Sequence, residues 1–223
     1  MTFTYRDEYG QVRQKEIADP HQPPPDPTVT TQTIVGLDLG QRQDYTALAF
    51  VERRQAGTVP AEYRVPRLRR WRETPYTQIR DELADRLPAW GLSSRDTLAI
   101  DGTGVGVAVT DIFAEAHFPT TMSSITITSG IEPTRVPGGW HVPKRELVGV
   151  VSVLLEQRRL LIADGLAEAA ILKTELGNFR LKMTAAGNET FSAWREADHD
   201  DLVLAVALAC WLGEQPQRRA YVY

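Results

Sequence analysis

The sequence predicts an α/β domain with a mixed central sheet, in which the first three strands are antiparallel and helices cover both faces. After a proline-rich beginning, the 223-residue chain carries three stretches of apolar and β-branched residues, separated by short polar turns. Farther along, helical and strand-like patterns alternate, which is typical of crossover connections between parallel strands. Hairpins followed by crossovers therefore indicate a mixed sheet.

Hydrophobic periodicity and turn residues place the individual elements. Strands are expected at residues 33–39, 45–52, 63–71, 97–100, 123–128 and 160–163. Helices are expected at residues 74–90, 107–116, 143–159, 165–176 and 198–212. Residues 179–184 and 190–194 flank the sequence Ala-Gly-Asn, and this pattern predicts a further hairpin. Thr74 is expected to cap the helix that follows it, with Pro75 in the first helical position.

Three segments are expected along the chain. Residues 1–30 should be a flexible, proline-rich N-terminal segment, because the run DPHQPPPDP favours extended polyproline geometry. Residues 31–214 should form the folded domain, and residues 215–223 a C-terminal tail.

The composition is that of an ordinary globular protein, with 42% hydrophobic and 24% charged residues. No apolar run reaches the ~18 residues that a membrane span needs, and the N-terminus lacks the apolar stretch of a secretory signal. A single cysteine, Cys210, excludes an internal disulfide and a cysteine-rich zinc site. We therefore expect a cytoplasmic protein.

The net charge of −4 does not by itself indicate a nucleic-acid-binding protein. The basic residues are nevertheless unevenly distributed, in a dense stretch and two shorter groups: Arg64, Arg67, Arg69, Arg70 and Arg72; Lys144 and Arg145; Arg158 and Arg159. Each group can equally be a solvated surface.

Acidic residues stand at three notable places. Asp38 lies inside the first buried strand, in VGLDLG, where a carboxylate is costly unless it is paired or bound to metal. Asp101 ends the strand in LAIDGTG, and ligand sites of α/β sheets gather at strand ends. Asp200 and Asp201 open the last helix, in HDDLVLAVALACW. If the first and fourth strands are neighbours, a helix lying across them can bring all these carboxylates together.

Such a convergence would favour divalent metal. Carboxylates in one place repel each other, and oxygen-only ligands suit magnesium or manganese. Two ions ~3.5–4 Å apart can activate a water and stabilise the leaving oxygen of a phosphodiester. Each residue also has a simpler explanation: Asp38 or Asp101 can bond a turn, and Asp198 or Asp200 can cap a helix.

These same segments carry a family resemblance. The strings IVGLDLGQRQDYTALAFVE, LAIDGTGVG, HVPKREL, LGNFRLKMTAAGNETFSA and HDDLVLAVALA resemble the C-terminal nuclease domain of phage large terminase subunits, over residues 34–211. The resemblance implies the ribonuclease-H-like fold, which retroviral integrases and Holliday-junction resolvases share. It also implies that Asp38, Asp101 and Asp201 are catalytic, and that these three with Asp200 hold two Mg²⁺ or Mn²⁺ ions.

The resemblance further implies an endodeoxyribonuclease that cleaves concatemeric double-stranded viral DNA during phage or prophage genome packaging, in the host cytoplasm. The expected partners are a terminase ATPase motor, the portal and the small terminase subunit. The phosphate loop of such a motor, G-x-x-x-x-G-K-[ST], does not occur in this sequence, so we expect a nuclease domain alone. Lys144, Arg145, Arg180 and Lys182 are candidate contacts to DNA phosphates.

Three alternatives remain open. The turns Asp38-Leu39-Gly40 and Asp101-Gly102-Thr103-Gly104 also suit a fragment of an actin-like ATPase or phosphotransferase, in which backbone N–H groups would cradle phosphates. A non-catalytic DNA-docking module is a second alternative. A junction-resolving nuclease, acting as a dimer on branched DNA, would share the metal chemistry of the first hypothesis.

Overall fold

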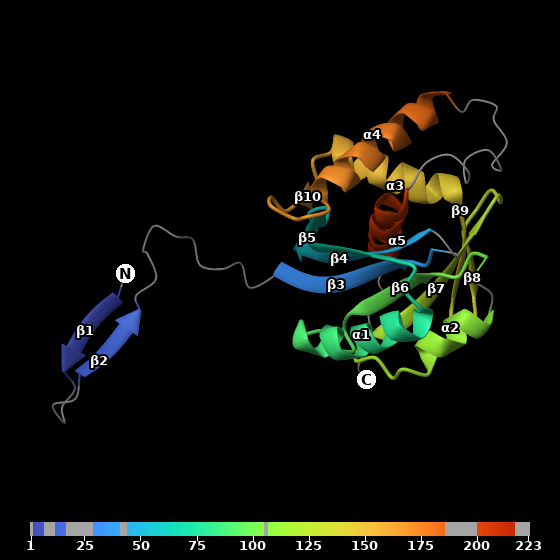
Figure 1. Cartoon of the computed structure of the whole chain (residues 1–223). Coiled ribbons are helices and arrows are strands. Elements are labelled where there is room, and N and C mark those ends of the chain that lie inside the picture. Colours follow the sequence, from blue (N-terminus) through green and yellow to red (C-terminus); the bar gives the residue numbers. More distant parts are fainter. Residues whose placement is uncertain are drawn as a thin grey trace, which may run out of the picture.

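The computed structural model describes residues 2–6, 12–16, 29–40, 44–104, 107–185 and 200–216. Its main feature is an eight-stranded sheet with the order β10-β5-β4-β3-β6-β7-β9-β8 (Figure 1). The strands are β3 (Val29–Asp38), β4 (Tyr45–Ala56), β5 (Glu62–Arg72), β6 (Thr97–Asp101), β7 (Thr121–Thr128), β8 (Thr134–Val136), β9 (Gly139–Pro143) and β10 (Leu160–Ile162).

The directions of the strands confirm the predicted mixed sheet. β3, β4 and β5 form an antiparallel meander. β6, β7 and β9 then extend the sheet from β3 in parallel, while β10 adds in parallel to β5 at the other edge. β8 closes the far edge as an antiparallel partner of β9.

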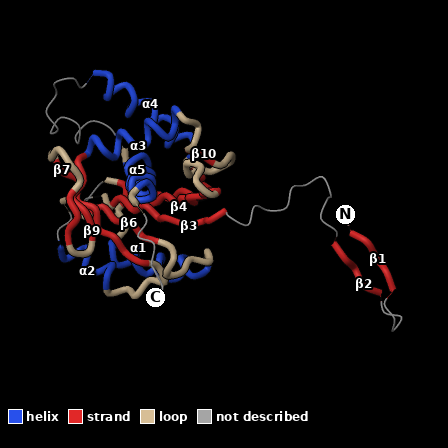
Figure 2. Tube along the Cα trace, turned by 180° about the vertical axis from the view of Figure 1, so that it is seen from behind, coloured by secondary structure: helices blue, strands red, loops and turns tan. Residues whose placement is uncertain are grey.

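Helices cover both faces of this sheet. α1 (Tyr76–Ala89) and α2 (Val107–Ala114) lie on one face, and α3 (Lys144–Glu156), α4 (Ala169–Ala185) and α5 (Asp201–Glu214) lie on the other (Figures 1 and 2). Each side has its own hydrophobic core, and successive residues of β3 alternate between them. Val35 and Leu37 pack on the α1 side, whereas Ile34 packs on the α5 side. None of the described helices combines the length and hydrophobicity that a membrane crossing requires.

Gly36 explains why α5 lies so close to the sheet. A Cβ atom at this position would stand 1.8 Å from the carbonyl oxygen of Ala205 in α5. Any side chain larger than hydrogen would therefore push the helix away. Ala205 and Ala209 keep the helix surface equally small, and both are completely buried.

Some sequence-based expectations need correction. Residues 179–184 were expected to begin a hairpin, but α4 continues through them to Ala185. The run FRLKMTA contains several good helix formers, and this propensity prevails over its weak alternation. The other expected strand of that hairpin, residues 190–194, lies outside the described residues. Thr74 does not cap α1, because its hydroxyl donates to the carbonyl of Arg72 and the N-cap residue is Pro75.

Four further strands among the described residues were not expected. The sequence did not predict β8 and β9, because they are short and contain or adjoin glycine and proline. The segment expected to be a flexible N-terminus includes β1 (Thr2–Arg6) and β2 (Val12–Glu16), which pair as a separate antiparallel sheet. The flexibility and the limits of the domain stay predictions.

Candidate active site

Asp38 and Asp101 lie side by side at the ends of two neighbouring parallel strands. β3 and β6 pair in a register that joins Leu37 to Ile100, so the next residue of each strand is an aspartate. Leu37 and Ile100 pack in the core on the α1 side, and the alternation of the strands turns both aspartates to the α5 side. Asp38 is 8% exposed and Asp101 is 7% exposed, so both carboxylates are buried.

The N-terminus of α5 brings a third carboxylate to this pair. Ala205 rests on Gly36, and Asp201 precedes Ala205 by one helical turn, about 6 Å along the axis. Asp38 follows Gly36 by two strand residues, about 6.6 Å in the opposite chain direction. Because the two steps match, the helix that lies on β3 places Asp201 over Asp38. Asp201 is 8% exposed.

The electrostatics around Asp38 reflect this convergence. Burial raises the pKa of Asp38 well above its usual value, and the negative charges of Asp101, Asp201 and Asp200 raise it further. A side-chain hydrogen bond between Asp38 and Asp101 acts in the same direction. Four aspartates from three elements therefore share one buried region at the carboxyl ends of β3 and β6.

Asp101 is also tied to the turn that follows it. One oxygen of its carboxylate, Oδ1, accepts the backbone N–H of Thr103 at 2.7 Å. The hydroxyl of Thr103 in turn accepts the backbone N–H of Ile127 at 2.6 Å. Asp101 therefore both stabilises the turn that follows it and belongs to the acidic cluster.

Among the described residues, Arg70 and Lys144 contact the acidic cluster. Arg70 Nη2 lies 2.8 Å from Asp201 Oδ2, and Lys144 Nζ lies 3.4 Å from Asp200 Oδ2. Asp38 pairs with Ala47, and Ala47 pairs with Arg70, so these residues form a row across β3, β4 and β5. The small side chain of Ala47 leaves room for Arg70 to reach across it toward α5.

Glu175 is a buried carboxylate that the sequence analysis missed. It is 5% exposed, and its Oε2 accepts the backbone N–H of Val203 at 3.0 Å, at the N-terminus of α5. Burial raises its pKa to about 7, with a further rise from Asp201, although the hydrogen bond from Val203 opposes this. A signal was present in the sequence, because Glu175 follows the core residue Leu172 by three positions and therefore lies on the buried stripe of α4.

The donor chemistry of the cluster fits hard divalent cations, because every candidate ligand is a carboxylate oxygen. Within the described residues, however, no group of three His, Cys, Asp or Glu side chains stands ready to hold a metal ion. The ion pairs give the physical reason. Asp201 and Asp200 each direct an oxygen to a cationic side chain, so metal ligation by both would require these contacts to change.

The predicted DNA-contacting residues have different surroundings. Lys144 is buried and lies beside Asp200. Arg145 is more exposed and contacts the backbone carbonyl of Ile131. Arg180 and Lys182 belong to α4, but their side chains lie outside the described part of the structure.

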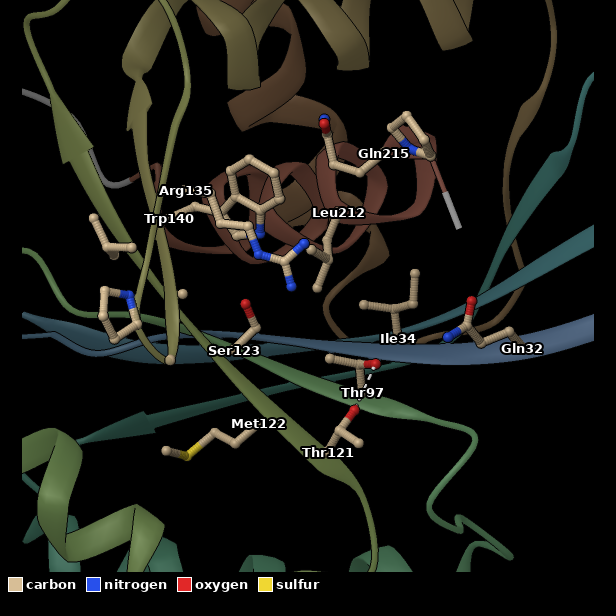
Figure 3. A pocket seen from close by; sticks show the side chains of 15 residues that line it. Gln32, Ile34, Thr97, Thr121, Met122, Ser123, Arg135, Trp140, Leu212 and Gln215 are labelled. Atoms are coloured by element: carbon tan, nitrogen blue, oxygen red, sulfur yellow. Dashed lines mark hydrogen bonds between the residues drawn. The ribbon is translucent and has the colours of Figure 1, made fainter. Parts of the chain in front are cut away.

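A separate cavity of about 520 Å³ lies at the opposite end of the sheet (Figure 3). Its lining includes Thr97 at the beginning of β6, Trp140 of β9 and Leu212 near the end of α5. Asp101 and Asp201 stand at the other ends of β6 and α5, so this cavity is not part of the acidic cluster.

Comparison of the sequence with protein-family models and with curated proteins finds no match. Among solved structures, the large terminase nuclease from thermophilic phage G20c with bound zinc is 18% identical over 80% of each chain, with a TM-score of 0.47. The Mn-soaked terminase nuclease domain of human cytomegalovirus is 12% identical over 82% of this chain and 84% of that chain, with a TM-score of 0.48. RuvC of Thermus thermophilus is 13% identical over 80% of this chain and 91% of that chain, with a TM-score of 0.39.

These solved structures belong to the classes that the sequence resemblance names, terminase nucleases and a protein that also occurs in complex with a Holliday junction. With TM-scores below 0.5, they assign no role to any single residue of this chain. The roles of the residues rest on the geometry of the acidic cluster itself.

Proposed function

We propose that this chain is a divalent-metal-dependent endodeoxyribonuclease, a hydrolase of DNA phosphodiester bonds. The observation that carries the proposal is the convergence of Asp38, Asp101 and Asp201 from two adjacent parallel strands and the N-terminus of α5. These three residues are the proposed catalytic residues, and together with Asp200 they are the proposed ligands for two Mg²⁺ or Mn²⁺ ions.

Metal ions held there would activate a water for attack and stabilise the departing oxygen of the phosphodiester. Asp38, whose charge is close to those of the other three aspartates, would be one of the ligands that hold the metal. Asp101 would act from one side, held in orientation by the N–H of Thr103. Asp201 and Asp200 would act from the helix, where Glu175 fixes the first turn through Val203.

The proposed substrate is double-stranded DNA, and the proposed role is the cleavage of concatemeric viral DNA during phage or prophage genome packaging. The family resemblance supports this role and the expected partners, namely an ATPase motor, the portal and the small terminase subunit. Arg145, Arg180 and Lys182 are the proposed phosphate contacts. The position of Lys144 beside Asp200 favours a role in holding that carboxylate.

Digestion of supercoiled plasmid with manganese tests the proposal. The wild-type protein should nick the plasmid, chelator should stop the reaction, and Asp38→Asn and Asp201→Asn should each slow it by at least about 10²-fold. Asp111→Asn is the matched control, because this aspartate lies exposed on α2, on the other face of the sheet. Wild-type protein that binds plasmid without cutting it under any divalent metal would leave the docking-module alternative in place of the nuclease.

A further inference from the structure

Arg70 is closely integrated into the acidic cluster. Its Nη2 atom lies 2.8 Å from Asp201 Oδ2, and the two side chains are only 11% and 12% exposed. Its guanidinium carbon lies 3.8 Å from the centroid of the Tyr45 ring, a close cation–π contact. The stacked ring and the strand position beside Ala47 both direct the guanidinium toward α5.

The position of Arg70 gives Asp201 a charged partner but leaves one hydrogen-bond donor of Arg70 itself without an acceptor in the part of the chain that the structure describes. Arg70 Nε is buried and has no hydrogen-bond partner among the described residues. Arg69 Nε, on the opposite face, is also buried without a partner among the described residues, so an unpaired donor does not by itself single out Arg70. The contact with Asp201 accounts for the position of Arg70, because several buried carboxylates next to one another need a compensating positive charge.

The charge that Arg70 supplies is the same charge that a divalent metal would supply. Asp201 can direct a given oxygen to the guanidinium or to a metal ion, and a fixed positive charge beside the cluster also repels an incoming cation. We propose that Arg70 is an internal competitor of divalent metal for Asp201, and that it thereby sets the metal concentration at which the site fills. This inference rests on the proposed metal-dependent function, and it adds a regulatory residue on β5 to the ligands on β3, β6 and α5.

Arg72 provides a matched control for this proposal. It lies two positions further along β5 on the same face and contacts the same ring, with its guanidinium carbon 5.4 Å from the Tyr45 centroid. Arg72 is exposed, whereas Arg70 is paired with Asp201. Removing Arg72 therefore changes the net charge equally without releasing a catalytic carboxylate.

The test is isothermal titration calorimetry of the full chain with Mn²⁺ alone. Arg70→Ala should bind Mn²⁺ about tenfold more tightly than the wild type, because a repelling and competing charge is removed. Arg70→Lys, which keeps the charge but loses the planar fork and the stacking, should lie between the two. Arg72→Ala should stay within about twofold of the wild type, because an exposed charge is screened by solvent.

Circular dichroism establishes first that each variant is folded. If Arg70→Ala does not fold, Arg70→Gln, which keeps most of the side-chain volume, carries the same comparison. Mn²⁺ affinity that is unchanged or weaker in the folded Arg70 variant overturns the inference. Plasmid digestion distinguishes this outcome from failure of the proposed function. A wild-type protein that binds Mn²⁺ without cutting DNA contradicts the proposed nuclease activity, but the competition between Arg70 and Mn²⁺ can still be measured by calorimetry.

Discussion

Arg69 and Arg70 are consecutive residues of β5 that form ion pairs on opposite faces of the same sheet. Arg69 Nη2 lies 2.6 Å from Glu82 Oε1 of α1, and Arg70 Nη2 lies 2.8 Å from Asp201 Oδ2 of α5. The distances are similar, but the surroundings differ. The Arg69 and Glu82 side chains are 38% and 21% exposed, whereas those of Arg70 and Asp201 are 11% and 12% exposed.

This difference separates a structural ion pair from a proposed functional one. Glu82 is surrounded by donors, since it also accepts the Trp71 indole N–H and a hydrogen bond from Arg86. Asp201 stands among other carboxylates, with Asp38 as its neighbour. The α1 face therefore satisfies its charge locally, and the α5 face concentrates negative charge. Excess buried charge of one sign is costly for stability and is expected at sites that bind a cation.

The largest expected effect concerns the close approach that creates the α5 face. Gly36→Ala should lower the free energy of unfolding by about 3–5 kcal/mol, because its Cβ would meet the Ala205 carbonyl oxygen at 1.8 Å and α5 would have to move. Gly149→Ala, in α3, meets nothing within 4 Å and should raise stability by up to about 1 kcal/mol. Urea denaturation measures both variants. A Gly36→Ala protein as stable as the wild type would show that α5 is not held against β3.

The second effect is a pH dependence that arises on the α5 face. Burial raises the pKa of Glu175 to about 7, above its ordinary value of 4.5. A carboxyl with a raised pKa binds a proton more readily in the folded state, so its contribution to stability is present at low pH. It is lost as pH rises from about 4.5 through about 7. We expect Glu175→Gln to remove on the order of 1–3 kcal/mol of this variation.

Urea denaturation of the wild type and Glu175→Gln between pH 5 and pH 8, in the presence of chelator, measures this effect. Glutamine retains an oxygen that can accept the N–H of Val203, so the variant should fold. Parallel stability curves for the two proteins would contradict the assignment of this titration to Glu175.

Asp38 gives a related but smaller effect on stability. Burial and the neighbouring aspartates raise its pKa, so the ionised form opposes folding at neutral pH. Asp38→Asn should therefore increase the unfolding free energy of the metal-free protein by about 1–2 kcal/mol, although it should slow DNA cleavage by at least about 10²-fold. Thermal unfolding in chelator, compared with Asp111→Asn, measures the gain. A loss of stability in Asp38→Asn would mean that this carboxylate is satisfied by its neighbours.

The sequence predicted the strand ends of this site better than it predicted the residues that support them. Asp38 and Asp101 were recognisable because each interrupts or ends an apolar strand. That the two strands are neighbours was only a condition of the prediction, and the pairing of β3 with β6 meets it. Arg70 was noticed only as one of several arginines. Which of them turns to α5 depends on the register between β4 and β5, and that register shifts between Phe50 and Glu52.

Glu175 and the course of α4 show a different limit. The helix expected at residues 165–176 already contained Glu175, but the sequence did not indicate which element the buried face of that helix would meet. Glu175 contacts α5 at Val203, and that contact spans 28 residues along the chain. Local periodicity indicates that this face of α4 is buried. Which helix the face meets is set by how helices pack against one another, and periodicity does not contain that information.

The smallest expected effect belongs to the α1 face and completes the contrast between the two ion pairs. Burial alone would raise the pKa of Glu82, but hydrogen bonds from Trp71 and Arg86 and the charge of Arg69 outweigh it, and the pKa is lowered. A carboxylate with a lowered pKa contributes stability above its unfolded pKa of about 4.5, and this contribution is lost as pH falls through the lower folded value.

Glu82→Gln should therefore cost at most about 1 kcal/mol at pH 7, because the pair is partly exposed and screened. The cost should shrink toward pH 3, opposite in sign to the pH dependence expected for Glu175. A double-mutant cycle of Glu82→Gln and Arg69→Gln, measured by urea denaturation at both pH values, isolates the pair. A coupling energy well above 1 kcal/mol would show that Arg69 is as strongly integrated into its face as Arg70, and burial would then not distinguish the two.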